Sequence, residues 1–201
     1  MSKFIKDNQG IMGLTLSHIG LIIATGILLT AVFSIIFLND WQRNAELKNI
    51  ATSFSTIVEG MDTRFFENTT EFHFPDKTYY YNVSISTEYV IVSAEGNQNN
   101  KLSIKERFIV KPWPRTSDQT WKTGEELHNY CLYTYGHSGT ILDPITQDDL
   151  GKLDNDNAAA CIDLALSPLY IQTNKAVYIE KVIIYYGTSE KQDFLLIYQI
   201  E

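Results

Sequence analysis

Only a few residues of this 201-residue chain have types and spacing that could support catalysis or metal binding. Segment 124–128, GEELH, places Glu125 and His128 on one helical face, but no third ligand is near, so we interpret it as solvated surface rather than a metal site. His137 is followed by Ser138, but the sequence specifies no acidic residue to orient the imidazole. We interpret this pair as a polar turn.

Two aspartates, Asp154 and Asp156, resemble the start of a calcium loop in the segment LDNDNAAA. The third oxygen ligand, the glycine and the distant glutamate of that loop are missing, so we expect an Asn/Asp-rich turn. The sequence also lacks a glycine-rich phosphate loop and the HExxH, GxSxG and CxxC motifs. We therefore expect no metal, no cofactor and no enzymatic activity.

The charge balance and the composition limit the partners and the fold. The chain has 16 Lys and Arg against 24 Asp and Glu, a net charge of -8. This balance argues against nucleic acid as a partner. Twelve Tyr, 10 Phe and 3 Trp suit half-buried β surface. We expect one soluble domain with substantial β structure after the N-terminal segment.

The N-terminal segment from Ile11 to Leu38 has 28 residues without Asp, Glu, Lys or Arg, whereas a bilayer span takes about 20 apolar residues. A cleavable secretory signal has an apolar region of about 7 to 15 residues and a small-residue cleavage site, and the following FLNDWQRNAEL offers no such site. A buried core helix is the other alternative, but it fits so long an uncharged segment poorly. We predict a transmembrane helix over 11–38, with a cytoplasmic leader over 1–10.

The orientation of the predicted span depends on features outside it, because Lys and Arg are nearly balanced on its two flanks. Asn68 and Asn82 each begin an N-x-[ST] tripeptide, which is meaningful only outside the cytoplasm, although such tripeptides also arise by chance. Cys131 and Cys161 could pair in an oxidising compartment or remain free buried thiols. We predict a single-pass protein of the cell membrane with a cytoplasmic N-terminus and an extracytoplasmic C-terminal domain.

Small and hydroxylated residues recur at four-residue spacing within the predicted span. Such spacing lets helix backbones approach closely in lipid, so we predict self-association of the span, although these residue types are also common in single spans. The predicted helix-packing residues are Gly13, Ser17, Gly20, Ala24, Gly26, Thr30 and Ser34.

The predicted fold is α+β. Apolar residues recur every three or four positions from Leu47 to Phe65, so we expect an amphipathic helix over 39–67 that continues the span. A mainly antiparallel β head, 68–201, follows, and we expect the piece from about Thr70 onward to fold by itself. Period-two alternation in TYYYNVSIS begins a three-stranded meander, and KAVYIEKVIIYYG with DFLLIYQIE forms a hairpin around the turn Gly187 to Asp193.

An insertion over 112–168 separates the two predicted β regions. Its first part, KPWPRTS, reads as a proline-stiffened loop. A short helix begins after Thr123, which forms a capping box with Glu126, and ends at Gly136. A second short helix is predicted in NAAACIDLALSP.

This layout resembles the type IV pilin-like proteins, especially their archaeal branch of pilins and archaellins. The resemblance lies in a short charged leader, Gly10, and a long apolar helix that continues as an amphipathic one into a β-rich head. It implies cleavage between Gly10 and Ile11 and a place in a surface filament. The chain departs from the family pattern at Gln9, where a basic residue often precedes the glycine, and at Thr15, where many pilins have glutamate. The sequence therefore leaves two functions open: a filament subunit or minor component that binds pilin-like subunits, and an anchored accessory protein whose head binds a cell-envelope or archaellum-type partner.

Overall fold

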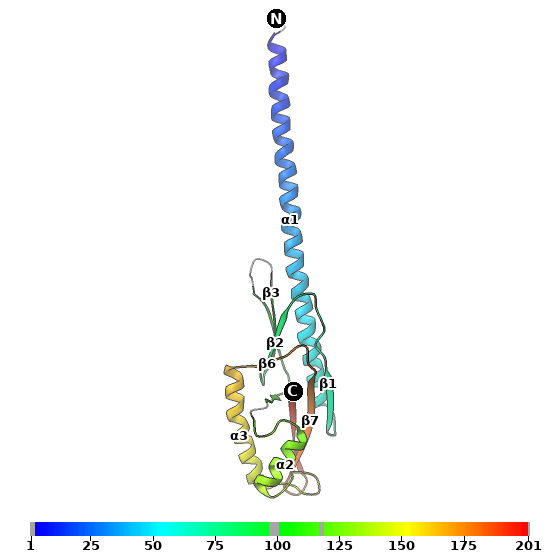
Figure 1. Ribbon diagram of the computed structural model, residues 1–201, viewed down its shortest axis with the longest axis vertical. Coiled ribbons are helices and arrows are strands. Elements are labelled where there is room, and N and C mark those ends of the chain that lie inside the picture. Colours follow the sequence, from blue (N-terminus) through cyan, green and yellow to red (C-terminus); the bar gives the residue numbers. More distant parts are fainter. Residues whose placement is uncertain (1–2, 97–100, 117–118, 201) are drawn as a thin grey trace. The chain divides into compact units, whose positions relative to one another are not determined.

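The computed structural model describes residues 3–96, 101–116 and 119–200, with the side chains of all of these except 3–16, 35–37 and 159. The chain divides into two compact units, an N-terminal unit, Met1–Arg43, and a second unit, Asn44–Glu201, which we call the head. The predicted α+β fold is confirmed (Figure 1). The elements are α1 (Lys3–Asp62), β1 (Asn68–Phe72), β2 (Tyr81–Ile85), β3 (Tyr89–Glu95), β4 (Lys101–Arg107), β5 (Pro112–Pro114), α2 (Gly124–Tyr135), α3 (Gln147–Leu166), β6 (Leu169–Ile171), β7 (Val177–Tyr186) and β8 (Glu190–Tyr198).

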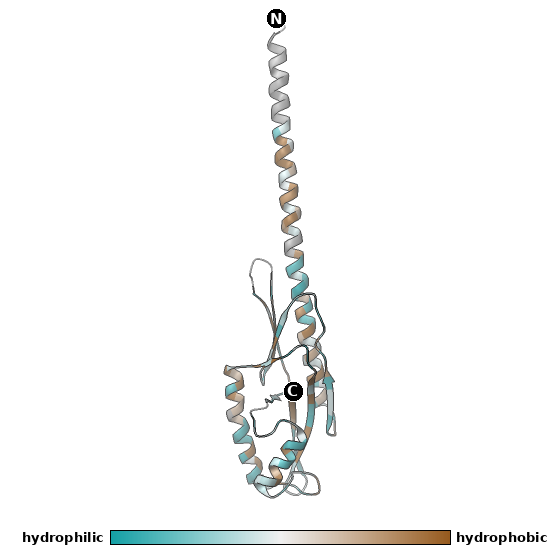
Figure 2. Ribbon diagram, in the orientation of Figure 1, coloured by the Kyte–Doolittle hydropathy of each residue, from teal (hydrophilic) through white to brown (hydrophobic). Residues whose placement is uncertain are grey.

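The N-terminal unit consists of helix α1 up to Arg43. All side chains from 17 to 34 are exposed, and Figure 2 colours this part of α1 mostly hydrophobic. The hydroxyls of Thr25, Thr30 and Ser34 donate to main-chain carbonyls four residues earlier, each at 2.8 Å. These three hydroxyl groups thus have their hydrogen-bond partners within the helix itself, as a polar group in an apolar environment requires.

The last part of α1 belongs to the head and carries one buried stripe. Leu47, Phe54 and Val58 are completely buried, and Ile50 and Met61 nearly so. This confirms the amphipathic pattern but moves the start of the head from the expected 68 to Asn44. The expected end of the stripe was wrong: α1 stops at Asp62, and Phe65 beyond it is 88% exposed.

One sheet of the head has the strand order β4-β3-β2-β6. The predicted antiparallel meander is confirmed, and β2 alternates as expected, with Tyr81, Val83 and Ile85 buried. These side chains pack in one core with the α1 stripe, where the Phe54 ring stacks on Phe74 with centroids 5.4 Å apart. Strand β6, which the sequence did not predict, pairs with the other edge of β2.

The second sheet has the order β1-β7-β8-β5. The predicted β7–β8 hairpin is confirmed, but β8 begins at Glu190, so the turn is shorter than expected; Gly187 adopts a left-handed φ of 61° there. The segment KPWPRTS is not only a loop, because Pro112–Pro114 pairs in parallel with β8. This short strand lies at the sheet edge, where missing N–H groups are tolerated. Strand β1 on the opposite edge was not predicted.

Strands β7 and β8 separate two hydrophobic cores. Leu195 and Ile197 of β8 face the core that contains the α1 stripe, whereas Phe194 and Leu196 face a second core formed with α2 and α3. Both faces of the sheet are therefore covered here. This explains why the FLLIY segment is apolar throughout instead of alternating.

The inserted helices pack on the second core. The capping box of α2 is confirmed, with Thr123 and Glu126 each accepting from the other's backbone N–H, and α2 ends at Gly136 with φ 81°. Helix α3 starts ten residues earlier than NAAACIDLALSP implied, since Thr146 caps it and Leu150 and Leu153 are buried. The expected Asn/Asp-rich turn around Asp154 and Asp156 is therefore wrong: it lies inside α3.

Candidate functional site

In the described part of the chain, one helix is long and apolar enough to cross a membrane. Ile23, Gly26, Ile27, Thr30, Ala31 and Ser34 line an open groove along its surface. A Cβ added at Gly20 or Gly26 would meet nothing within 4 Å. No contact within the N-terminal unit requires glycine at these two positions.

The other residues predicted for the span are less informative. Ser17 and Ala24 are exposed on α1. Gly10, Ile11 and Gly13 lie within the helical backbone of α1, but their side-chain environments fall outside the described residues. Processing at Gly10 thus stays a prediction.

The two glycosylation tripeptides occupy different positions in the sheets. Asn68 is the first residue of the edge strand β1 and is half-buried. Asn82 is in β2, between β3 and β6, and its Oδ1 accepts a hydrogen bond of 3.1 Å from the hydroxyl of Tyr170. Asn68 is therefore the less enclosed of the two acceptors.

The cysteines are free thiols in the structure, so the pairing that the sequence left open is not formed. Cys131 is completely buried in α2, and Cys161 of α3 is half-buried. Burial raises the pKa of the Cys131 thiol to about 11, with a smaller contribution from the charge of Asp149. Cys131 is thus an unreactive core residue.

The polar turn after α2 contains the acidic partner that the sequence did not specify. Asp143 Oδ1 lies 2.7 Å from His137 Nδ1, and its other oxygen accepts from the backbone N–H of Ser138 at 2.7 Å. The hydrogen bond with His137, followed by that from Ser138, lowers the pKa of Asp143. The Ser138 hydroxyl pairs with Thr140 instead of His137, at 3.0 Å. The group therefore fixes a turn and does not assemble a nucleophile.

His128 connects three segments of the head, contrary to the expected solvated surface. Its side chain is 18% exposed. Nδ1 lies 2.8 Å from the carbonyl oxygen of Ser138, and Nε2 lies 3.2 Å from Glu67, which also accepts from the N–H of Ile183. Within the described residues, no group of three or more His, Cys, Asp or Glu could hold a metal ion. His128 therefore joins α2 to the turn after it and, through Glu67, to β7.

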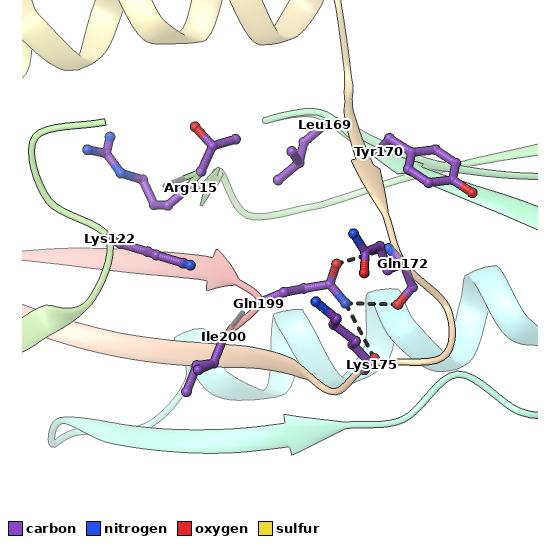
Figure 3. A pocket seen from close by; sticks show the side chains of 9 residues that line it. Arg115, Lys122, Leu169, Tyr170, Gln172, Lys175, Gln199 and Ile200 are labelled. Atoms are coloured by element: carbon purple, nitrogen blue, oxygen red, sulfur yellow. Dashed lines mark hydrogen bonds between the residues drawn. The ribbon is translucent and has the colours of Figure 1, made fainter. Parts of the chain in front are cut away.

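A basic pocket of about 160 Å³ lies where the ends of β6 and β8 meet the loops after β5 and before α2 (Figure 3). We name it by its three cations, Arg115, Lys122 and Lys175. Arg115 is 5% exposed; its Nε and Nη2 both donate to the carbonyl oxygen of Trp121, at 3.0 and 2.7 Å, and it lies over the Trp121 ring. The remaining lining residues are Thr116, Leu169, Tyr170, Gln172, Gln199 and Ile200.

The sequence did not reveal this pocket. Its cations come from positions 115, 122 and 175, and only the pairing of β5 and β6 into their sheets brings these loops together. A basic cluster that is assembled from distant segments leaves no spacing signal in one sequence. No known protein family, curated protein or solved structure matches the chain.

Proposed function

We propose that this chain is a non-enzymatic, membrane-anchored protein with an extracytoplasmic head, and that it is a subunit or minor component of a pilin-like surface filament. The observation that carries the proposal is the exposed, uncharged stretch of α1 between residues 17 and 34. Nine large apolar side chains are exposed there: Ile19, Leu21, Ile22, Ile23, Ile27, Leu28, Leu29, Val32 and Phe33.

The exposure of this stretch argues against a soluble core helix, which would bury most of these side chains. Ile22 is 70% exposed, and none of the most apolar window is buried. Leaving nine such side chains in water costs on the order of 10 kcal/mol relative to an apolar environment. That amount is comparable to the whole stability of a typical domain, which supports our proposal that a bilayer or a helical filament core covers the stretch.

The division of α1 supports a pilin-like arrangement. Residues 47–61 supply a stripe to the core of the head, so these side chains are not available to pack against neighbouring copies. Filament contacts are therefore assigned to the stretch before Arg43, with its small residues at Gly20, Ala24 and Gly26. Close backbone approach at such residues is how helices associate without a hydrophobic drive.

The alternative is a permanently anchored accessory protein whose head binds a cell-envelope partner. Gln9 and Thr15 favour it, because both positions depart from the pattern of processed pilin-like leaders. The two functions share the anchor and the extracytoplasmic head. They differ in the fate of the leader.

Mass spectrometry of the protein isolated from its native membranes separates the two functions. A filament component is expected to start at Ile11, and a Gly10→Leu variant should keep the leader, whereas the matched Gly13→Leu variant should still be processed. A leader that is retained in the unmodified chain removes the filament function and leaves the accessory one. Recovery of the full chain in the soluble fraction, without detergent, would refute both.

A further inference from the structure

The basic pocket is an electrostatic exception in an acidic protein. The chain has a net charge of -8, but three cations line this one small pocket. None of the three forms a salt bridge among the residues that the structure describes. Positive charges that are gathered in a concave site without paired carboxylates attract anions.

Arg115 places a buried guanidinium in the wall of the pocket. Burial lowers the pKa of Arg115 to about 10, and the charge of Glu126 opposes this effect only in part. The guanidinium therefore stays charged at neutral pH although it is 5% exposed. Glu126 therefore offsets part of the charge of Arg115, while its Oε2 accepts from the N–H groups of Lys122 and Thr123 at 2.6 and 3.2 Å. The positive charge that remains for an anion comes mainly from the two lysines of the pocket.

The two lysines supply the groups that an anion would contact. In Figure 3 the side chains of Lys122 and Lys175 both extend toward Gln199, whereas the guanidinium of Arg115 is turned away toward its own loop. We therefore assign direct hydrogen bonds to the lysines and only a long-range field to Arg115. Ammonium groups bind phosphate and carboxylate oxygens as mobile point charges.

The turn that carries Lys175 is fixed to β8. Gln199 accepts from the N–H of Gln172 through Oε1 at 2.9 Å, and its Nε2 donates to the carbonyl oxygens of Gln172 and Lys175 at 2.9 and 3.3 Å. This amide adds to the turn's own backbone hydrogen bond, from the N–H of Lys175 to the carbonyl oxygen of Gln172 at 3.1 Å. Because the turn is held in place before any ligand arrives, less ordering is needed on binding.

The volume of the basic pocket limits the size of the ligand that it can bind. The pocket holds about 160 Å³, whereas sites for drug-sized molecules have roughly 300 to 1,000 Å³. Leu169 and Ile200 form apolar parts of the wall. We propose that the pocket between β6, β8 and the loop before α2 binds a small oxyanion, a phosphate or carboxylate group, either free or as the acidic group of a larger molecule. This site is independent of the filament function.

Calorimetric titration of the full chain in neutral detergent at low ionic strength tests the proposal. The probes are inorganic phosphate and glucuronate, with glucose as the uncharged comparison and polygalacturonate as the polymeric source of carboxylate. We expect saturable binding of phosphate or glucuronate with a Kd of about 1 mM or below and no binding of glucose. Tighter binding of polygalacturonate than of glucuronate, per acidic unit, assigns the site to a polymer; equal binding assigns it to a free anion.

Variants decide whether the pocket is the site. The double change Lys122→Gln and Lys175→Gln should weaken binding at least about tenfold, Lys122→Arg with Lys175→Arg should retain it, and the exposed Lys101→Gln on β4 should have no effect. Neither lysine of the pocket is in a hydrophobic core, so the variants should keep the circular dichroism and melting temperature of the parent. No saturation below about 10 mM, equal binding of glucose, or unchanged binding in the glutamine variant would overturn the proposal.

Discussion

The head should fold only if it includes the last part of α1. We compare two fragments, 44–201 and 68–201, because the first contains the buried stripe and the second is the head that the sequence had suggested. The structure predicts that 44–201 is a cooperative folded unit and that 68–201 is not. The difference tests whether residues 47–61 are core or linker.

The expected loss can be estimated from burial. Leu47, Ile50, Phe54, Val58 and Met61 are each at most 4% exposed, and burying such a side chain contributes about 1.5 to 3 kcal/mol. Their removal therefore withdraws about 8 to 15 kcal/mol, which equals or exceeds the typical stability of a domain, about 5 to 15 kcal/mol.

Polar contacts add to this loss. Glu46 Oε2 accepts from the Tyr79 hydroxyl at 3.0 Å and pairs with Lys77 at 3.2 Å, and Glu59 Oε1 accepts from the N–H of Ile109 at 3.0 Å. These contacts are partly exposed, so we expect each to contribute at most about 1 kcal/mol. They confirm that this part of α1 is joined to the loops before β2 and after β4.

Urea unfolding followed by near-ultraviolet circular dichroism measures the effect, since Trp113 and Trp121 belong to the head. Fragment 44–201 should unfold in one transition, and 68–201 should show none. Within 44–201, Phe54→Ala should lower the free energy of unfolding by about 3 to 5 kcal/mol, whereas Thr56→Ala on the exposed face should change it by less than about 0.5 kcal/mol. A cooperative transition of 68–201 at the same urea concentration as 44–201 would refute the reasoning.

Three further predictions concern single groups of the head. Lys181→Met should lower the free energy of unfolding by about 3 kcal/mol in urea titration. This buried ammonium donates to the carbonyl oxygens of Asp62, the last residue of α1, and Arg64, and it pairs with the carboxylate of Asp193, which is one-third exposed. A thiol reagent should label Cys161 before unfolding and Cys131 only afterwards, without reductant, as mass spectrometry would show. Hydrogen bonds lower the pKa of Asp143, so the ionised carboxylate stabilises the fold at every pH above the ordinary carboxyl pKa. This contribution is lost as the pH falls through the lowered pKa. His137→Ala removes one of these hydrogen bonds and should raise the pKa of Asp143 in an NMR titration.

Sequence patterns predicted those elements whose signals are local. Thr123 and Glu126 define the start of α2 within four residues, and the alternation of Tyr81, Val83 and Ile85 identifies β2. Both patterns arise from interactions between near neighbours or from one buried face. For such elements the three-dimensional context only confirms what the chain already specifies.

Features that depend on distant segments could not be predicted in this way. Strand β1 exists because residues 68–72 pair with β7 more than a hundred positions later, and its own sequence, NTTEF, has no clear apolar alternation. Helix α3 was predicted too short, since the polar segment DNDN gave no sign that Leu150 and Leu153 before it would be buried. The acidic partner of His137 and the three cations of the basic pocket likewise become neighbours only through loop and sheet geometry.

The two proposed recognition surfaces should respond to different perturbations. In the N-terminal unit, Thr25, Thr30 and Ser34 donate their hydroxyl hydrogens to their own helix, so few donors remain for a neighbour. The proposed association therefore relies on close packing at Gly20 and Gly26. Such packing is sensitive to side-chain volume and insensitive to salt. Recognition in the basic pocket depends on ammonium charges and is therefore weakened by salt while it tolerates arginine for lysine. A single condition, higher ionic strength, thus separates anion binding by the head from association of the N-terminal helix.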